Sequence, residues 1–297
     1  MLFRSLYRPS DRLPTPTIDR PFVIVPGWST QPKAFDALTK LLTRNGANDG
    51  QTYFVKQGQF YTLDADGALQ PLSPPPTHGR VFEMVWTDTH QSPNHNLPEM
   101  RQNLEAICNA TGYDKLDIEG YSMGGLDTRL YIDQGGSRVN RFMMLGTPNH
   151  GTRFGDLVAD VLDRDVKWAI KFAGISGADR ESMNWLRQEK NSPLLTDLNS
   201  RAGQQQRVAP TLSVGTDVMP TAGRRGLTRG DGLVPSSSLG LPGGNTIVLH
   251  EAMQHGRLND DPTVQHVRSV FFGWGLPADA GAKFGSDAGV MKQVPHP

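Results

Sequence analysis

The sequence is poor in several features that mark particular classes of protein. It has one cysteine, Cys108, in 297 residues, which excludes an intramolecular disulfide and a cysteine-based zinc site. Its 30 Lys and Arg residues are balanced by 30 Asp and Glu residues, so it lacks the basic surplus with which proteins bind nucleic-acid phosphates. No apolar run reaches the length of about 18 residues that a membrane-spanning helix needs.

The two ends of the chain also lack recognisable signals. Charges are spread through residues 1–12 and no apolar core of a signal peptide is present, so we expect a cytoplasmic protein, with leaderless export or a recloned mature form as alternatives. Residues 1–20 are polar and proline-rich and predict an N-terminal arm without regular structure. Residues 277–297 predict a flexible tail. Between them, residues 21–276 can form one large domain.

Strand-like and helix-like patterns alternate through this domain. Short apolar runs predict buried strands, and apolar residues spaced three or four apart predict helices, one of them over 97–110 and the last over 263–272. This alternation predicts an α/β fold with a mostly parallel central sheet flanked by helices, whose chemistry gathers at the carboxyl ends of the strands. The runs that predict strands are 22–25, 53–55, 60–63, 81–86, 116–118, 142–145, 211–214 and 246–249.

Three connecting segments have their own expected structures. A helix should follow the first strand, beginning near Ser29 or Thr30 and ending at Asn45-Gly46. Asp64 to Gly67 reads as a hairpin turn more readily than as a calcium loop, because the later calcium ligands are missing. The polar, glycine-rich residues 215–232 predict a long loop.

Residues 153–200 interrupt the alternation with one or two amphipathic helices. Their apolar positions run from Leu157 to Leu162 and from Val166 to Ala173. Ordinary helices on the flank of the sheet would explain this pattern. A cap over a reaction site, with an apolar underside for an acyl chain, would explain it too, and the position of the segment favours the cap.

A candidate nucleophile stands in Gly120-Tyr121-Ser122-Met123-Gly124-Gly125. A strand-like run precedes this stretch and a helix-like run follows it. A serine on such a sharp turn, with glycines two residues before and after it, is typical of a nucleophile elbow. Glycine is needed because side chains there would collide with the neighbouring strand and helix. We therefore predict Ser122 to be a nucleophile.

A serine hydroxyl needs a general base, and the base needs a carboxylate that orients it. Where a nucleophile elbow is used, the acid and then the histidine follow the serine along the chain. His255, on a glycine-flanked loop before the last helix, is favoured over His250. Asp231, between two glycines, is favoured over Asp217, although either aspartate could instead cap a local turn.

The oxyanion of an acyl-transfer intermediate requires backbone N–H donors. Met123, directly after the serine, would supply one, and Trp28, in the loop after the first strand, would supply the other. Both residues are also candidate walls of an apolar substrate site. His150 could line the mouth of the site, but a solvated loop histidine is the favoured account.

Five motifs, in order over residues 22–272, resemble those of the α/β-hydrolase superfamily, and within it the bacterial lipases and esterases related to triacylglycerol lipases. They are Val25-Pro26-Gly27-Trp28, the Ser122 elbow, Gly146-Thr147-Pro148-Asn149-His150-Gly151-Thr152, Gly230-Asp231-Gly232-Leu233-Val234-Pro235 and His255-Gly256-Arg257-Leu258.

The resemblance implies cleavage of carboxylic esters by a Ser-His-Asp triad through an acyl-enzyme. It also implies a helical lid over residues 150–207. Pro26 departs from the pattern, because such lipases more often have a histidine there that steadies the oxyanion loop. Calcium and zinc ligands of the group are not matched, so we infer no metal and no cofactor.

We therefore expect a serine hydrolase acting on a small-molecule ester or a lipid, with transient contact to a lipid interface and no nucleic-acid partner. The same machinery could serve an acyltransferase or a thioesterase, which differ only in the acceptor or the acyl donor. A hydrolase-fold binding protein without catalysis is the remaining alternative.

Overall fold

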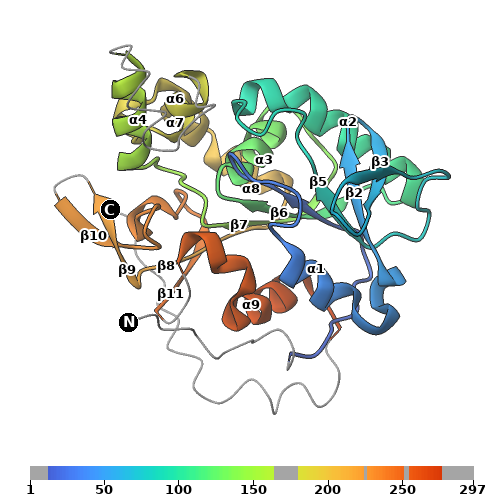
Figure 1. Ribbon diagram of the computed structural model, residues 1–297. Coiled ribbons are helices and arrows are strands. Elements are labelled where there is room, and N and C mark those ends of the chain that lie inside the picture. The colour runs from blue at the N-terminus through green and yellow to red at the C-terminus, as the bar shows by residue number, and fades with distance from the viewer. Residues whose placement is uncertain (1–12, 164–179, 224–225, 251–253, 276–297) are drawn as a thin grey trace.

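The computed structural model describes residues 13–163, 180–223, 226–250 and 254–275 (Figure 1). Within these ranges nine strands form one sheet in the order β11-β8-β7-β6-β1-β5-β2-β3-β4. The first seven of these are parallel to their neighbours, and β3 and β4 continue the sheet in antiparallel pairing. The predicted α/β class with a mostly parallel sheet is confirmed. The strand bounds are β1 Phe22–Val25, β2 Thr52–Lys56, β3 Gln59–Leu63, β4 Leu69–Pro71, β5 Val81–Met84, β6 Leu116–Tyr121, β7 Val139–Leu145, β8 Thr211–Thr216 and β11 Asn245–Leu249.

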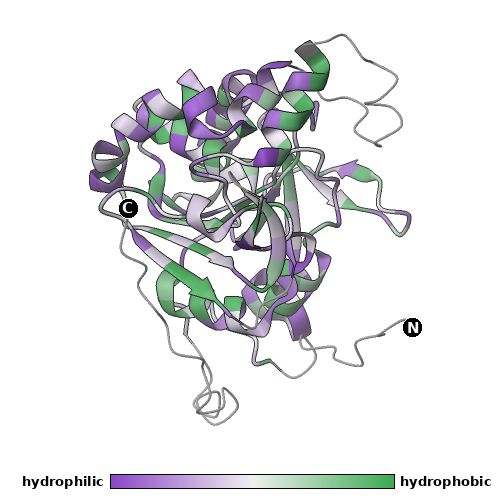
Figure 2. Ribbon diagram, turned by 90° about the vertical axis from the view of Figure 1, so that its left-hand side faces the viewer, coloured by the Kyte–Doolittle hydropathy of each residue, from purple (hydrophilic) through white to green (hydrophobic). Residues whose placement is uncertain are grey.

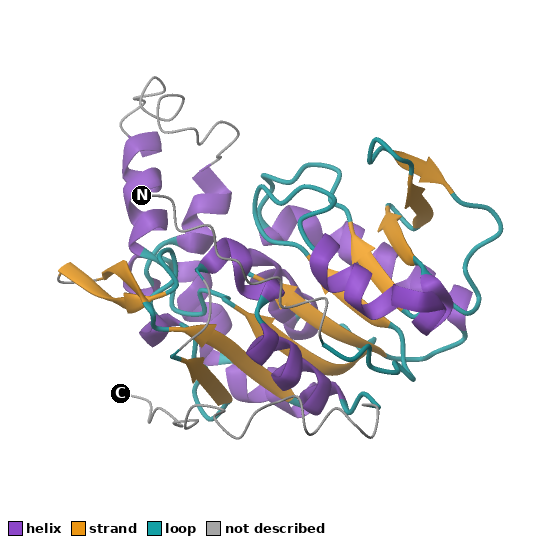
Figure 3. Cartoon of the chain, turned by 60° about the horizontal axis from the view of Figure 1, so that its bottom comes forward, coloured by secondary structure: helices purple, strands orange, loops and turns teal. Residues whose placement is uncertain are grey.

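Helices cover both faces of this sheet (Figures 1 and 3). On one face Ile24 of β1 packs with Leu38 and Val264, and on the other Val25 packs with Leu104 and Tyr131. In Figure 2 the helices carry both purple and green segments, the alternation expected of helices with one buried side. The first face is covered by α1 (Asp36–Thr43) and α9 (Pro262–Phe272), and the second by α2 (Pro93–Thr111), α3 (Met123–Asp133) and α8 (Ala202–Val208).

Two of the expected segments differ from the structure. Helix α1 begins at Asp36 and not near Thr30, because Ser29 and Lys33 have positive φ angles of 58° and 78°, which no helix accommodates. The predicted loop over 215–232 contains an antiparallel hairpin, β9 (Met219–Gly223) and β10 (Gly226–Gly230). Its strands are mostly exposed and rich in glycine, and they lack the apolar alternation that reveals a strand.

The expected insertion is helical where it is described. Helices α4 (Arg153–Asp163), α6 (Arg180–Leu186) and α7 (Pro193–Ser200) lie together beyond the edge of the sheet (Figure 1). Val158, Trp185 and Leu195 form one apolar cluster with Met123 and Leu126 of α3. The second predicted apolar stripe, Val166 to Ala173, lies outside the described residues, and the role of this segment as a lid stays a prediction.

The two expected terminal segments lie largely outside the described residues. Residues 1–12 of the expected arm and the whole expected tail, 277–297, lie outside the described residues. Thr17 pairs with Gly275 in an antiparallel bridge, so the end of the arm adjoins the end of the domain. None of the described helices has the length and apolar character that crossing a bilayer requires. Cys108 is buried, and burial raises the pKa of its thiol to about 11.

One buried acid makes the stability of this fold depend on pH. Glu83 of β5 is 2% exposed, and burial, together with the nearby charge of Asp36, raises its pKa from 4.5 to about 8. The folded protein therefore keeps this carboxyl protonated at pH values where the unfolded chain ionises it. Stability is lost as the pH rises from 4.5 to 8 and is not regained above that.

We predict that Glu83→Gln stabilises the protein at pH 8, because the neutral amide removes this linkage. The gain should be on the order of 2–4 kcal/mol at pH 8 and should shrink towards pH 4.5. Thermal unfolding at both pH values measures it. Glu105→Gln is the control, since the Glu105 side chain is 48% exposed and Arg138 lowers its pKa. A gain from Glu83→Gln that is independent of pH would contradict the prediction.

Candidate active site

Ser122 stands on the sharp turn between β6 and α3. Its backbone angles, φ 54° and ψ −125°, lie in a region that non-glycine residues rarely adopt. The Ser122 amide donates to the carbonyl of Leu145, at the end of β7, with an N···O distance of 2.9 Å. This hydrogen bond from Ser122 to the neighbouring strand β7 helps to maintain the unusual backbone conformation of the serine.

The glycines around the turn are required by close backbone contacts. A Cβ atom at Gly124 would lie 2.2 Å from the carbonyl oxygen of Val25, and one at Gly120 would lie 2.6 Å from the Cα of Gly125. A Cβ at Gly27, in the loop after β1, would lie 2.8 Å from the Cβ of Ser122. Contacts this short do not occur in folded proteins, so the glycines allow the two strand ends to meet at the serine.

His255 reaches the serine from the loop that follows β11. Its Nε2 lies 3.0 Å from Ser122 Oγ, and its side chain is 13% exposed. Gly146, with φ +61°, makes room for the ring, because a Cβ there would lie 3.1 Å from His255 Cε1. The imidazole is thus positioned within hydrogen-bond distance of the hydroxyl.

Asp231 lies on the other side of the imidazole. Its Oδ2 is 2.6 Å from His255 Nδ1, and its Oδ1 accepts hydrogen bonds from the amides of Leu233 (2.9 Å) and Val234 (2.7 Å). The His255 amide also donates to the Asp231 carbonyl, at 2.9 Å. The carboxylate is 1% exposed and bonded through both oxygens, so its orientation is fixed.

The two less favoured residues form a separate pair. His250 Nδ1 lies 2.8 Å from Asp217 Oδ1, and the side chains are 46% and 15% exposed. Arg229 of β10 donates to the Asp217 carbonyl at 2.9 Å, which fastens the hairpin to the end of β8. The structure therefore brings Asp231 and His255 to Ser122 and pairs Asp217 with His250. The catalytic roles themselves stay predictions.

Tyr121 is a site residue that the sequence analysis did not identify. Its hydroxyl donates to the carbonyl of His255 at 2.8 Å, and the two rings lie 5.2 Å apart between centroids. Burial and the charge of Asp231 raise the pKa of Tyr121 above its usual range, so the hydroxyl remains a donor. Only its position next to Ser122 could have drawn attention to it.

The two expected oxyanion donors lie on facing segments. Met123 is the first residue of α3, and a Cβ at Gly27 would lie 3.2 Å from its amide nitrogen, so the loop that carries Trp28 adjoins this amide. The Trp28 indole donates to the carbonyl of His90 at 3.2 Å. Their roles as donors and as walls of a substrate site stay predictions.

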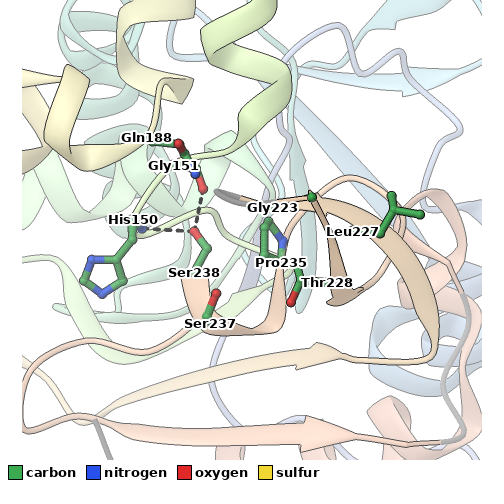
Figure 4. A pocket seen from close by; sticks show the side chains of 10 residues that line it. His150, Gly151, Gln188, Gly223, Leu227, Thr228, Pro235, Ser237 and Ser238 are labelled. Carbon is green, nitrogen blue, oxygen red and sulfur yellow. Dashed lines mark hydrogen bonds between the residues drawn. The ribbon is translucent and has the colours of Figure 1, made fainter. Parts of the chain in front are cut away.

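His150 is not a freely solvated loop residue. Its Nδ1 lies 2.5 Å from Glu189 Oε2, and its side chain is 31% exposed. It lines an open pocket of about 470 Å³ beside the β9–β10 hairpin (Figure 4). In that pocket Ser238 Oγ donates to the Gly151 carbonyl at 2.7 Å and accepts from the His150 amide at 3.1 Å. Within the described residues, no cluster of three or more His, Cys, Asp or Glu could hold a metal ion.

Known structures with this architecture include a lipase and a phospholipase. The chain superposes on mature Bacillus licheniformis lipase BlEst2 with a TM-score of 0.54 and 16% identity, over 87% of this chain and 93% of that one. It superposes on phospholipase PlaB from Legionella pneumophila with a TM-score of 0.55 and 13% identity, over 90% and 62% of the two chains. The chain has the α/β-hydrolase fold.

The sequence is similar to that of a curated lipase over a part of the chain. Over 85 residues, 29% of the chain, it is 33% identical to a triacylglycerol lipase of Pseudarthrobacter phenanthrenivorans, and this stretch is 27% of that protein. No family model matches the chain. The resemblance to bacterial lipases and esterases that the motifs predicted is nevertheless confirmed by these similarities.

We predict that Gly124→Ala disables the site, because the added methyl group meets the carbonyl oxygen of Val25 at 2.2 Å. The serine or the loop after β1 must shift by about 1 Å to relieve this contact, and a misplacement of about 1 Å costs roughly 100-fold in rate. Ester hydrolysis measures the loss. Gly203→Ala is the matched control, because nothing lies within 4 Å of a Cβ there. Equal activity of the two variants would contradict the prediction.

Proposed function

We propose that the protein is a serine hydrolase that cleaves carboxylic esters. The proposal rests above all on one arrangement, in which Ser122 Oγ lies 3.0 Å from His255 Nε2 and His255 Nδ1 lies 2.6 Å from Asp231 Oδ2. A hydroxyl becomes a strong nucleophile when an oriented base can take its proton. Similarity to a triacylglycerol lipase over 85 residues favours an ester as the substrate.

In the proposed first half-reaction, His255 Nε2 takes the proton of Ser122 as Oγ attacks the ester carbonyl carbon. The resulting oxyanion accepts hydrogen bonds from the amides of Met123 and Trp28, and each such donor is worth about 3–4 kcal/mol in the transition state. Asp231 holds the imidazole and stabilises its positive charge. The imidazolium then gives its proton to the departing alkoxide, and the acyl group stays on Ser122.

In the second half-reaction, water replaces the alcohol. His255 takes a proton from the water as its oxygen attacks the acyl carbon, and the second oxyanion uses the same two amides. Collapse of this intermediate returns the proton to Ser122 Oγ and releases the carboxylic acid. An acyltransferase would use another alcohol at this step, so the products formed with added alcohol distinguish the two activities.

An apolar acyl group fits the surroundings of the serine. Met123 belongs to the apolar cluster that α4, α6 and α7 form on α3, and Trp28, Phe154 and Leu194 are partly buried against it. Partly exposed apolar side chains beside a nucleophile favour substrates with an acyl chain over polar esters. Residues 150–207 would then act as the lid.

We predict that Ser122→Ala abolishes hydrolysis of p-nitrophenyl butyrate and labelling by a fluorophosphonate probe. The expected loss is on the order of 10⁴-fold or more, because the remaining groups cannot supply a nucleophile. Ser237→Ala is the control and should keep full activity, because Ser237 is an exposed residue of the short 3₁₀ helix Ser236–Ser238. Activity retained in Ser122→Ala would refute the proposed nucleophile.

We also predict that Asp231→Asn and Asp217→Asn differ sharply. An amide at position 231 can favour the wrong imidazole tautomer and should reduce kcat by on the order of 10³–10⁴-fold. Asp217 makes an ion pair with an exposed histidine, which is worth about 1 kcal/mol or less. Its variant should keep most of the activity. Initial rates on one ester measure both, and the reverse order would assign the acid to Asp217.

A further inference from the structure

The loop after β1 carries the proposed second oxyanion donor, and few groups within this loop can fix the orientation of its backbone. The Trp28 amide belongs to the peptide between Gly27 and Trp28, and Gly27 has no side chain because none fits beside Ser122. Glycine permits wide rotation of the backbone. Pro26 stands where related lipases more often have a steadying histidine, so other groups must fix the orientation of this amide.

The segment after β5 supplies fixed contacts on both sides of that peptide. The indole Nε1 of Trp86, which is 2% exposed, donates to the carbonyl of Pro26 at 3.1 Å. After the peptide, the Ser29 amide donates to the carbonyl of Thr89 at 2.7 Å. The Trp28 indole donates to the carbonyl of His90 at 3.2 Å.

We propose that Trp86 is a positioning residue for the oxyanion hole. Its buried N–H, acting through the Pro26 carbonyl, fixes the peptide plane before Gly27, and the contacts of Trp28 and Ser29 fix the chain after it. The rotation that Gly27 allows is thereby restricted, and the Trp28 amide stays directed towards the site. This inference rests on the proposed function, because it assigns a task to a loop of that same site.

The inserted segment also contacts the residues after β5 that hold the oxyanion loop. Ser182 of α6 donates its hydroxyl to the carbonyl of His90, which also accepts the Trp28 indole. Its neighbour Glu181 accepts a hydrogen bond from Asn94 at 2.7 Å, at the start of α2. Helix α6 is therefore hydrogen-bonded to the segment after β5 that contacts the oxyanion loop. Ser182 is the second positioning residue.

Trp86→Phe tests the proposal, because phenylalanine keeps an aromatic ring and removes the N–H donor. Trp274→Phe is the matched control: this indole is also buried, and its Nε1 has no hydrogen-bond partner among the described residues. The kinetics of both variants would be measured with p-nitrophenyl butyrate and with its thionoester. The thionoester places sulfur, a weak hydrogen-bond acceptor, where the oxyanion forms.

A misplaced donor should cost less than the roughly 100- to 1000-fold loss that follows removal of one. For Trp86→Phe we expect kcat on the ester to fall about 10- to 100-fold with KM changed less than about 3-fold. The preference for the ester over the thionoester should fall by a similar factor. Trp274→Phe should match the wild type in both respects.

Several outcomes would overturn the proposal. They are an unchanged kcat in Trp86→Phe, or a lower kcat with the ester preference intact, which indicates only a structural role. If Trp86→Phe does not fold, Ser182→Ala decides, and an unchanged ester preference in that variant overturns the proposal. Ser122→Ala separates this test from the proposed function, because an inactive Ser122→Ala beside a normal Trp86→Phe refutes the role of Trp86 alone.

Discussion

The close approach of three strand ends is the constraint on which the rest of the structure depends. Val25 of β1 is in register with Gly120 of β6, and Tyr121 of β6 with Leu145 of β7. This register places the loop after β1, the turn at Ser122 and the loop after β7 side by side. Side chains would separate them, so glycine stands at each point of contact. Gly27 and Gly124 are required by the pairing of distant strands, whereas Gly120 is required by its own turn, where a Cβ would meet Gly125.

A second constraint connects the serine to the loop that carries the histidine. Glu119 of β6 and Arg268 of α9 form a fully buried, two-bond ion pair with N···O distances of 2.6 and 2.8 Å. Arg268 also donates to Asn259, in the turn that begins at His255. A buried charge left without its partner is costly. Glu119 and Tyr121, on either side of Gly120, thus attach the histidine loop to the strand that ends at the serine.

Most of the fold could be predicted from the sequence. So could the three side chains that the structure brings together at the candidate site, Ser122, Asp231 and His255. Strands β1, β5 and β6 are buried along their whole length, and β1 is apolar at every position, so its run is unambiguous. Hairpin β9–β10 could not be recognised from the sequence, because its residues are mostly exposed. Its two strands are held by their pairing with each other and not by the burial of apolar side chains, so they leave no apolar pattern in the sequence. The start of α1 was missed for a different reason: the loop before it is held by contacts to Thr89 and His90, residues some sixty positions away.

The two aspartates and the two histidines show what neighbouring residues in the sequence can reveal about a site and what they cannot. Flanking glycines favoured Asp231, and the structure gives that preference a cause, since the Leu233 and Val234 amides turn back onto its carboxylate. No local pattern indicates that the other two residues contact each other, because Asp217 and His250 meet only through the pairing of β8 with β11. Both pairs lie where strands end. A histidine and an aspartate at hydrogen-bond distance are therefore insufficient to identify a catalytic pair, and the buried carboxylate whose position the backbone fixes is the stronger candidate.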